Sequence, residues 1–239
     1  MKRFYKQAAV LSDADGFAVA LDGKPIRTPG GQRLLLPAEA LAAAIAEEWQ
    51  AQPADRDIRP NEMRLMRLAA TGIDRVPPQR TRVIDDTAKY AGTDLLCYRA
   101  DGPDDLVVRQ HRAWQPVLDW AAERYGVSLL VHTGLLHHPQ PDEALRRYRD
   151  EVARHSNLGL SGLFNLTAAC GSLLLALAIA EGRIDSEAGY QAAEVDALYQ
   201  VERWGEDREA AERRAGIRAD IAAAAEFLSL LGPARLRAC

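Results

Sequence analysis

The sequence predicts an α+β protein: a small mixed α/β N-terminal domain with an antiparallel β-meander, followed by an all-helical C-terminal domain. Short apolar runs separated by Gly, Asp and Pro fill the first forty residues, a pattern typical of strands joined by tight turns. Beyond Pro78 apolar residues recur at helical spacing with little interruption. We therefore expect two domains, residues 1–77 and 78–239.

Four short strands are expected in the N-terminal domain, over residues 8–11, 17–21, 25–28 and 32–36. Asp22-Gly23 is a strong hairpin signal, because both turn positions tolerate positive φ. After the strands, Leu41, Ile45 and Trp49 share one face of a helix that packs on the sheet. A second helix over residues 62–76 is stopped by the prolines that follow it.

Residues 156–180 contain no charged side chain and are long enough to cross a bilayer. Glycine and polar residues dilute the first half, and no cluster of positive charge lies on one side to orient a span. A helix that is apolar all round also fits the centre of a helical domain. We expect a buried helix and no membrane insertion; a membrane-anchored protein is the competing interpretation.

Composition argues against several classes of protein. A net charge of −4 is unlike that of a nucleic-acid-binding protein, which meets phosphates with a basic patch. The N-terminus has no apolar leader, and arginine and alanine are abundant, so we expect a cytoplasmic protein from a bacterium. We also expect a monomer.

The three cysteines, Cys97, Cys170 and Cys239, are far apart and form no C-x-x-C pair. This spacing suggests neither a zinc clamp nor a redox dithiol. Cys97 and Cys170 are expected to be small buried apolar side chains in a reducing compartment.

Familiar catalytic motifs are missing. No G-x-G-x-x-G, G-x-x-x-x-G-K-[ST], H-E-x-x-H or G-x-S-x-G sequence occurs, so no nucleotide, cofactor or metal is expected. The adjacent side chains of His137 and His138 point apart and are poorly placed to share a metal. The acidic pairs are expected on solvated helix faces; they are Glu47-Glu48, Asp85-Asp86 and Asp104-Asp105.

The helix that ends near Gly205 is more informative. Glu202 follows Val195 and Leu198 at helical spacing, which places a carboxylate in line with an apolar stripe and beside Trp204. Asp196, Gln200 and Arg203 share another face. Either Glu202 reaches solvent at the helix end or pairs with an arginine, or Glu202 and Trp204 form a contact surface for another protein.

Taken together, the motifs resemble one family, the assembly chaperones of the alpha subunit of F-type ATP synthase, found in bacteria and mitochondria. The matching segments run over nearly the whole chain: residues 3–6, 21–29, 47–52, 67–69, 73–74 and 90–99, Gln110, Trp114, Pro116, Trp120 and residues 200–206. The resemblance implies a mixed α/β domain and a helical domain. It also implies a protein that is not an enzyme: it binds the unassembled alpha subunit and shields its interface until the beta subunit replaces it.

The chain departs from the family at several positions, including Met63-Arg64-Leu65-Met66 and the segment after Gly205. An acidic function near the C-terminus is implied by the resemblance, and Asp196, Glu202 or Glu206 could carry it; we take Glu202 first. The expected partner-binding residues are Glu202, Trp204, Asp196, Gln200, Glu206 and Arg203.

The alternative is a small-molecule enzyme of unrecognised type that uses Glu202, Asp196 and a histidine as acid and base. An enclosed polar pocket with perturbed carboxylates would favour the enzyme. A broad exposed groove would favour the chaperone.

Overall fold

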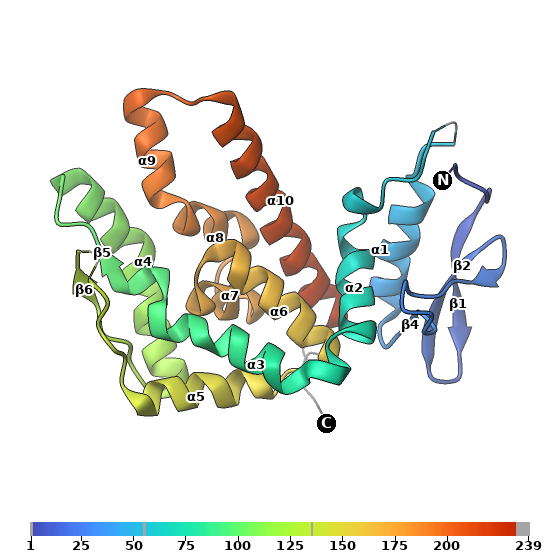
Figure 1. Cartoon of the computed structure of the whole chain (residues 1–239), viewed down its shortest axis with the longest axis horizontal. Coiled ribbons are helices and arrows are strands. Elements are labelled where there is room, and N and C mark those ends of the chain that lie inside the picture. Colours follow the sequence, from blue (N-terminus) through green and yellow to red (C-terminus); the bar gives the residue numbers. More distant parts are fainter. Residues whose placement is uncertain (1, 55, 135, 233–239) are drawn as a thin grey trace. The chain divides into compact units, whose positions relative to one another are not determined.

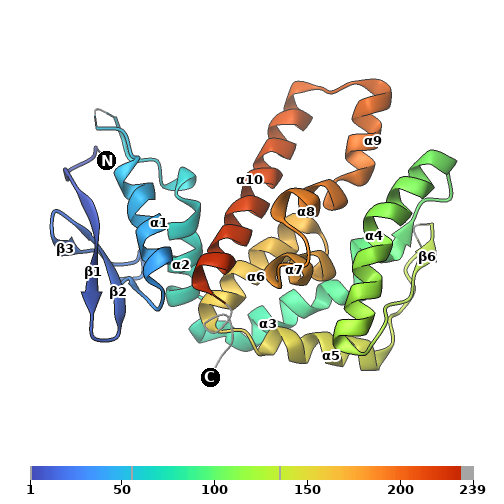
Figure 2. The same ribbon diagram turned by 180° about the vertical axis from the view of Figure 1, so that it is seen from behind.

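A computed structural model describes residues 2–54, 56–134 and 136–232 and confirms the α+β class, with a small antiparallel sheet followed by helices (Figure 1, Figure 2). Contacts divide the chain into two compact units. The first holds residues up to 80, 155–162 and those from 226 onward; the second holds 81–154 and 163–225. The division of the chain into domains 1–77 and 78–239 stays a prediction.

The sheet of the first unit consists of β1 (Ala8–Asp13), β2 (Gly16–Leu21), β3 (Lys24–Pro25) and β4 (Leu35–Leu36). β1 and β2 form an antiparallel hairpin in register over their whole length. The turn from β2 to β3 has positive φ at Asp22 and Gly23, 47° and 78°, as expected for this hairpin sequence.

The fourth strand differs from a simple meander, because β4 pairs with β2 and not with β3. β1 occupies one edge of β2, so β3 and β4 lie one after the other along the opposite edge. The turn over residues 28–32 returns the chain to β2 through hydrogen bonds between Thr28 and Gln32 and between Gly31 and Thr28. At Gly16 a Cβ would lie 2.5 Å from the Leu36 carbonyl oxygen, so the pairing needs glycine there.

Two helices complete this part of the first unit. α1 (Glu39–Gln50) buries Leu41 and Ile45 against the sheet, and α2 (Arg64–Asp74) packs beside α1. Glu48 is not the solvated carboxylate that was expected. Its oxygens accept the backbone N–H groups of Leu65 and Met66, both at 2.8 Å, and so satisfy the first turn of α2. Burial raises the pKa of Glu48.

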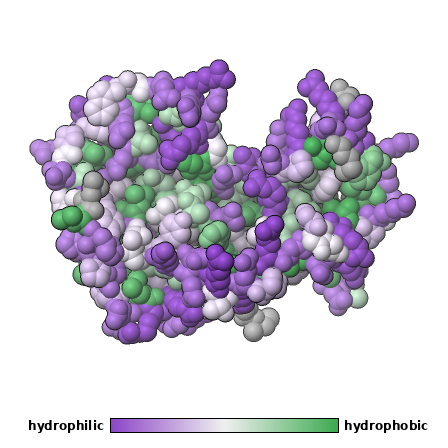
Figure 3. Space-filling model, in the orientation of Figure 1, coloured by the Kyte–Doolittle hydropathy of each residue, from purple (hydrophilic) through white to green (hydrophobic). Residues whose placement is uncertain are grey.

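The rest of the chain is mainly helical. A two-stranded parallel sheet, β5 (Tyr98–Arg99) with β6 (His132–Thr133), interrupts the helices. The helices are α3 (Arg80–Ala88), α4 (Asp104–Tyr125), α5 (Asp142–Ala153), α6 (Asn157–Cys170), α7 (Leu173–Ala180), α8 (Ser186–Ala193), α9 (Val195–Trp204) and α10 (Arg208–Leu231). Figure 3 shows hydrophilic residues over most of the visible surface, with smaller apolar areas among them.

The uncharged stretch 156–180 forms two helices, α6 and α7, separated at Gly171, where φ is +64°, and Ser172. In α7 every residue from 173 to 179 is buried. No helix within the described ranges has both the length and the apolar character needed to cross a membrane. The apolar sequence of α7 therefore belongs to the core of the second unit.

The first turn of α7 is held by two buried polar side chains, Ser172 and Asp94. The Ser172 hydroxyl donates to Asp94 (2.7 Å) and accepts from the Leu175 N–H (3.0 Å). Asp94 also accepts from the N–H groups of Leu174 and Leu96. Burial raises the pKa of Asp94 to about 6, although these hydrogen bonds favour the ionised form and limit the rise.

Cys97 and Cys170 are buried free thiols, as predicted. Burial raises the pKa of each to about 12, so both are poor nucleophiles. Cys239 lies outside the described residues.

The raised pKa of Asp94 predicts a pH-dependent stability. Because the folded state holds this proton more tightly than the unfolded chain, Asp94 contributes most below pH 4 and the contribution is lost as pH rises through about 6. Relative to Asp94→Asn, the wild-type free energy of unfolding should fall by roughly 2–3 kcal/mol between pH 4 and pH 7. Urea unfolding of both proteins across this range measures the difference, and a pH-independent difference would contradict the prediction.

Candidate functional site

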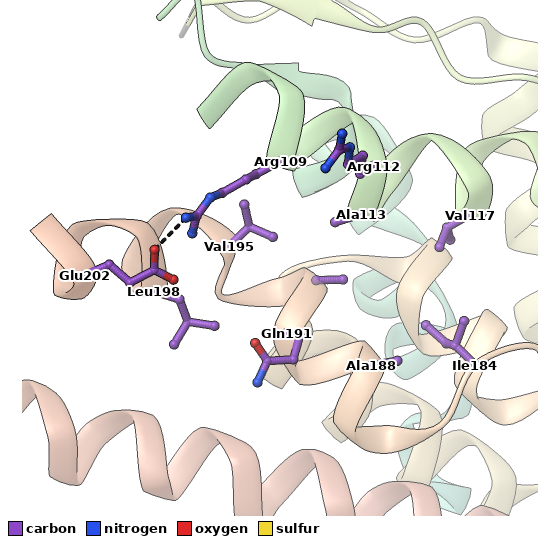
Figure 4. A pocket seen from close by; sticks show the side chains of 11 residues that line it. Arg109, Arg112, Ala113, Val117, Ile184, Ala188, Gln191, Val195, Leu198 and Glu202 are labelled. Carbon is purple, nitrogen blue, oxygen red and sulfur yellow. Dashed lines mark ion pairs between the residues drawn. The ribbon is translucent and has the colours of Figure 1, made fainter. Parts of the chain in front are cut away.

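A groove with a cavity of about 460 Å³ opens between α4, α8 and α9 in the second unit (Figure 4). Most of its lining is apolar, and charged or polar side chains make up the remainder. The apolar residues are Ala113, Val117, Ile184, Ala188, Ala192, Val195 and Leu198; the others are Arg109, Arg112, Gln191 and Glu202. We refer to this feature as the α4–α9 groove.

Helical spacing explains how the groove is assembled. On α9, Val195, Leu198 and Glu202 fall on one face, as the sequence indicated. On α4, Arg109 and Val117 lie two helical turns apart and line the groove from the other side. The predicted alignment of Glu202 with an apolar stripe is therefore confirmed.

Glu202 and Arg109, which both line the groove, form an ion pair with 2.6 Å between Arg109 Nη2 and Glu202 Oε2. Figure 4 shows the two side chains reaching toward each other from different helices. The Glu202 side chain is 56% exposed and the Arg109 side chain is 44% exposed. The hydrogen bond from Arg109 lowers the pKa of Glu202, so this carboxylate is ionised at neutral pH. Glu202 thus reaches solvent, pairs with an arginine and borders an apolar groove.

Asp105 makes a second connection between the start of α4 and the end of α9. It accepts a hydrogen bond from the Tyr199 hydroxyl at 2.8 Å and forms an ion pair with Arg203. These contacts lower the pKa of Asp105, with the Tyr199 hydrogen bond as the largest cause. Asp105 lies on an exposed helix face, as expected, but its two partners are more than 90 residues away in the sequence, so the pairing itself was not predicted.

Asp196 takes part in a third connection. The side chain of Gln110, only 2% exposed, donates to Asp196 at 2.7 Å and accepts from the Ala100 N–H at 2.8 Å. Nearby, the indole N–H of Trp114 donates to the Ala192 carbonyl at 2.7 Å. Asp196 therefore holds α9 to α4 and is not among the residues that line the groove.

The other predicted residues lie apart from the groove lining. Gln200 is exposed, and Trp204 at the end of α9 is 77% exposed. Glu206 forms an ion pair with the buried Arg214 of α10. The six predicted residues thus occupy one helix and the turn after it, but they do not converge on one point.

The sequence analysis did not predict that α4 and α9 are connected through Arg109, Asp105 and Tyr199. Asp105 and Arg109 are four residues apart, a spacing that normally indicates a pair along one helix. Each instead pairs with α9. A sequence pattern shows which face a side chain is on, but not which distant helix meets that face.

Metal-ligating side chains are scattered. Within the part of the chain that the structure describes, no group of three or more His, Cys, Asp or Glu residues is arranged to hold a metal ion. His138 stacks on His132, with ring centroids 4.0 Å apart, and His137 hydrogen bonds to Tyr98.

Comparison with known proteins gives the family. The family model described as ATP12 chaperone protein matches residues 2–122, half of the chain. The chain belongs to the ATP12 chaperone family. The matched segment includes the α4 side of the groove, with Asp105, Arg109 and Gln110.

Individual ATP12 relatives extend the similarity over nearly the whole chain. The crystal structure of Atp12 from Paracoccus denitrificans is 42% identical, has a TM-score of 0.89 and covers 96% of this chain and 98% of its own. A chaperone candidate from Agrobacterium tumefaciens is 38% identical, with a TM-score of 0.88, covering 96% and 86%. The mitochondrial protein atp12 of Schizosaccharomyces pombe is 24% identical over 88% of this chain and 76% of its own. The resemblance inferred from the sequence motifs is confirmed.

The α4–α9 contacts predict unequal effects on stability. Gln110→Ala should lower the free energy of unfolding by about 2 kcal/mol, because it leaves the Ala100 N–H and the Asp196 carboxylate without their partner. Arg109→Ala should change the unfolding midpoint little, because its pair with Glu202 is exposed. Urea unfolding followed by circular dichroism tests both, and equal losses would contradict this ranking.

Proposed function

We propose that this ATP12-family protein binds the unassembled alpha subunit of the F-type ATP synthase and releases it when the beta subunit arrives. The observation that carries the proposal is the α4–α9 groove, a mainly apolar cavity with charged side chains in its lining. One of the helices that form it, α9, ends in the exposed Trp204. Membership of a chaperone family supports a role in assembly.

The composition of this region suits a protein partner. A ring subunit that lacks its neighbours exposes apolar surface, which aggregates unless another protein covers it. Val195, Leu198 and Ile184 offer apolar area for such a contact, and a tryptophan that is 77% exposed is a typical anchor residue. The charged side chains at the edge, Arg109 and Glu202, would add specificity more than affinity.

The groove supports binding better than catalysis. General acid–base chemistry needs two groups whose environments separate their pKa values. Among the groove residues Glu202 is the one carboxylate, Arg109 lowers its pKa, and no histidine is present. Burial raises the pKa of two other carboxylates, Asp94 and Glu48, but neither lines the groove. Each accepts backbone N–H groups at the start of a helix, Asp94 at α7 and Glu48 at α2. We therefore propose stoichiometric binding without turnover, and no cofactor.

We further propose that the protein acts as a monomer in a bacterial cytoplasm. Both solved relatives named above come from bacteria, Paracoccus denitrificans and Agrobacterium tumefaciens.

The proposal predicts a complex with one subunit. Mixed with unassembled alpha subunit, the chain should co-elute with it in size-exclusion chromatography, and it should not co-elute with the beta subunit. Light scattering should show that alpha aggregates more slowly in its presence. If alpha aggregates equally fast with and without the chain and no complex elutes, the proposed function is wrong.

Variants locate the contact. Trp204→Ala should weaken binding of the alpha subunit about tenfold, because the variant lacks the large exposed side chain that would become buried in the complex. Leu136→Ala is the matched control, since Leu136 is 79% exposed in the same unit but lies outside the groove. Glu202→Ala should weaken binding less and reduce its dependence on salt. Equal effects of Trp204→Ala and Leu136→Ala on the dissociation constant would place the contact elsewhere.

A further inference from the structure

A second cavity, of about 430 Å³, lies wholly within the first compact unit and shares no residue with the α4–α9 groove. It is bordered by the turn after β3, the end of α1, the segment before α2, and α2 itself. Its lining consists of Arg27, Thr28, Pro29, Trp49, Ile58, Pro60, Met63, Met66, Arg67, Ala70, Thr71, Asp74 and Arg75. We call it the Trp49 pocket.

The interior of the Trp49 pocket is apolar and adaptable. Met63 and Met66 are buried, and Trp49 and Ile58 are half-buried beside them. Methionine side chains are flexible and polarisable, so they adjust to apolar groups of different shape. Such a pocket suits an aliphatic side chain without demanding one particular residue.

The Trp49 indole carries a hydrogen-bond donor without a partner. Its Nε1 is inaccessible to water, and no acceptor for it is found among the described residues. The Tyr5 hydroxyl donates to the backbone carbonyl of Trp49 at 2.6 Å, and the Tyr5 and Trp49 rings meet edge to face with centroids 5.8 Å apart. Because this N–H is out of reach of water, it is also out of reach of a ligand oxygen of similar size, and Trp49 lines the pocket as an apolar ring.

Positive charge surrounds the pocket. Arg27, Arg67 and Arg75 are all exposed, and within the described ranges none of them forms an ion pair with a carboxylate. The single acidic residue, Asp74, already accepts from the Thr28 hydroxyl at 2.6 Å and the Gly30 N–H at 2.8 Å. The lining therefore has two more cations than anions, with guanidinium groups available for carboxylates.

We propose that the Trp49 pocket binds an extended acidic polypeptide segment of the form acid–x–apolar–x–acid. Arg67 lies on α2 and Arg75 directly follows that helix, eight positions further on, which is about 12 Å along the helix axis. Residues i and i+4 of an extended chain are about 13 Å apart, and residue i+2 points to the same face. Two carboxylates can thus meet the two arginines while the apolar side chain between them enters the pocket.

This proposal does not rest on the identity of the proposed client, because it concerns a different set of residues and a peptide ligand. Fluorescence polarisation of the full-length protein with labelled Glu-Ala-Leu-Ala-Glu tests it directly. Two further peptides separate the contributions of charge and of the apolar side chain to binding. Lys-Ala-Leu-Ala-Lys reverses the charge, and Glu-Ala-Ser-Ala-Glu removes the apolar side chain. The first peptide should bind at least about tenfold more tightly than either of the others, and salt should weaken its binding.

Variants of the full-length chain assign the site. Arg67→Glu and Arg75→Glu should each weaken binding of the first peptide about tenfold. Lys24→Glu makes the same charge change on an exposed residue of the same unit outside the pocket, and it should have little effect. Circular dichroism confirms that each variant is folded.

Absent binding, equal binding of the three peptides, or equal weakening by Arg67→Glu and Lys24→Glu would each overturn the proposal. None of these results would alter alpha-subunit binding at the α4–α9 groove, so the two proposals fail separately.

Discussion

A helix that is buried on every side can exist only if the backbone groups at its start find partners inside the protein. α7 is such a helix, and Asp94 and Ser172 supply those partners. The arrangement is demanding, because a carboxylate taken out of water is costly unless several donors surround it. Asp94 accepts from a hydroxyl and from backbone N–H groups before and within α7, so it ties the segment ahead of β5 to the central helix.

The position of α7 determines where the α4–α9 groove lies. α4 and α8 both pack on α7, and each contributes one side of the groove. α9 is then fixed to α4 by Asp105, Arg109 and Gln110, of which Gln110 is buried and the other two contacts are exposed. The buried amide holds α9 against α4, and the exposed ion pairs add two further contacts between the start of α4 and the end of α9. A groove built on packed helices keeps its shape without a ligand, which lowers the entropic cost of binding.

Much of this was accessible from the sequence, and the omissions share a cause. Periodicity placed the helices and aligned Glu202 with Val195 and Leu198, because those signals are local. The pairing of β4 with β2, and the roles of Glu48 and Asp105, depend on residues distant in the sequence. The Trp49 pocket was missed for the same reason, since its lining comes from four separate segments. The stretch 156–180 was expected to form one buried helix, but it forms two, because the chain turns at Gly171 and Ser172. α7 is buried as expected, whereas α6 has exposed positions.

An exposed ion pair beside an apolar surface suits a partner that must later leave. Breaking the Arg109–Glu202 pair is inexpensive, because both side chains are about half exposed and water replaces the lost contact. Charged groups of an incoming protein can therefore replace the Arg109–Glu202 contact with little net change in free energy. Such charges discriminate between partners more than they increase the affinity. In the proposed complex, affinity then depends on the apolar area that Val195, Leu198 and Trp204 offer. On the same proposal, a subunit with a larger complementary interface would displace this chain by mass action.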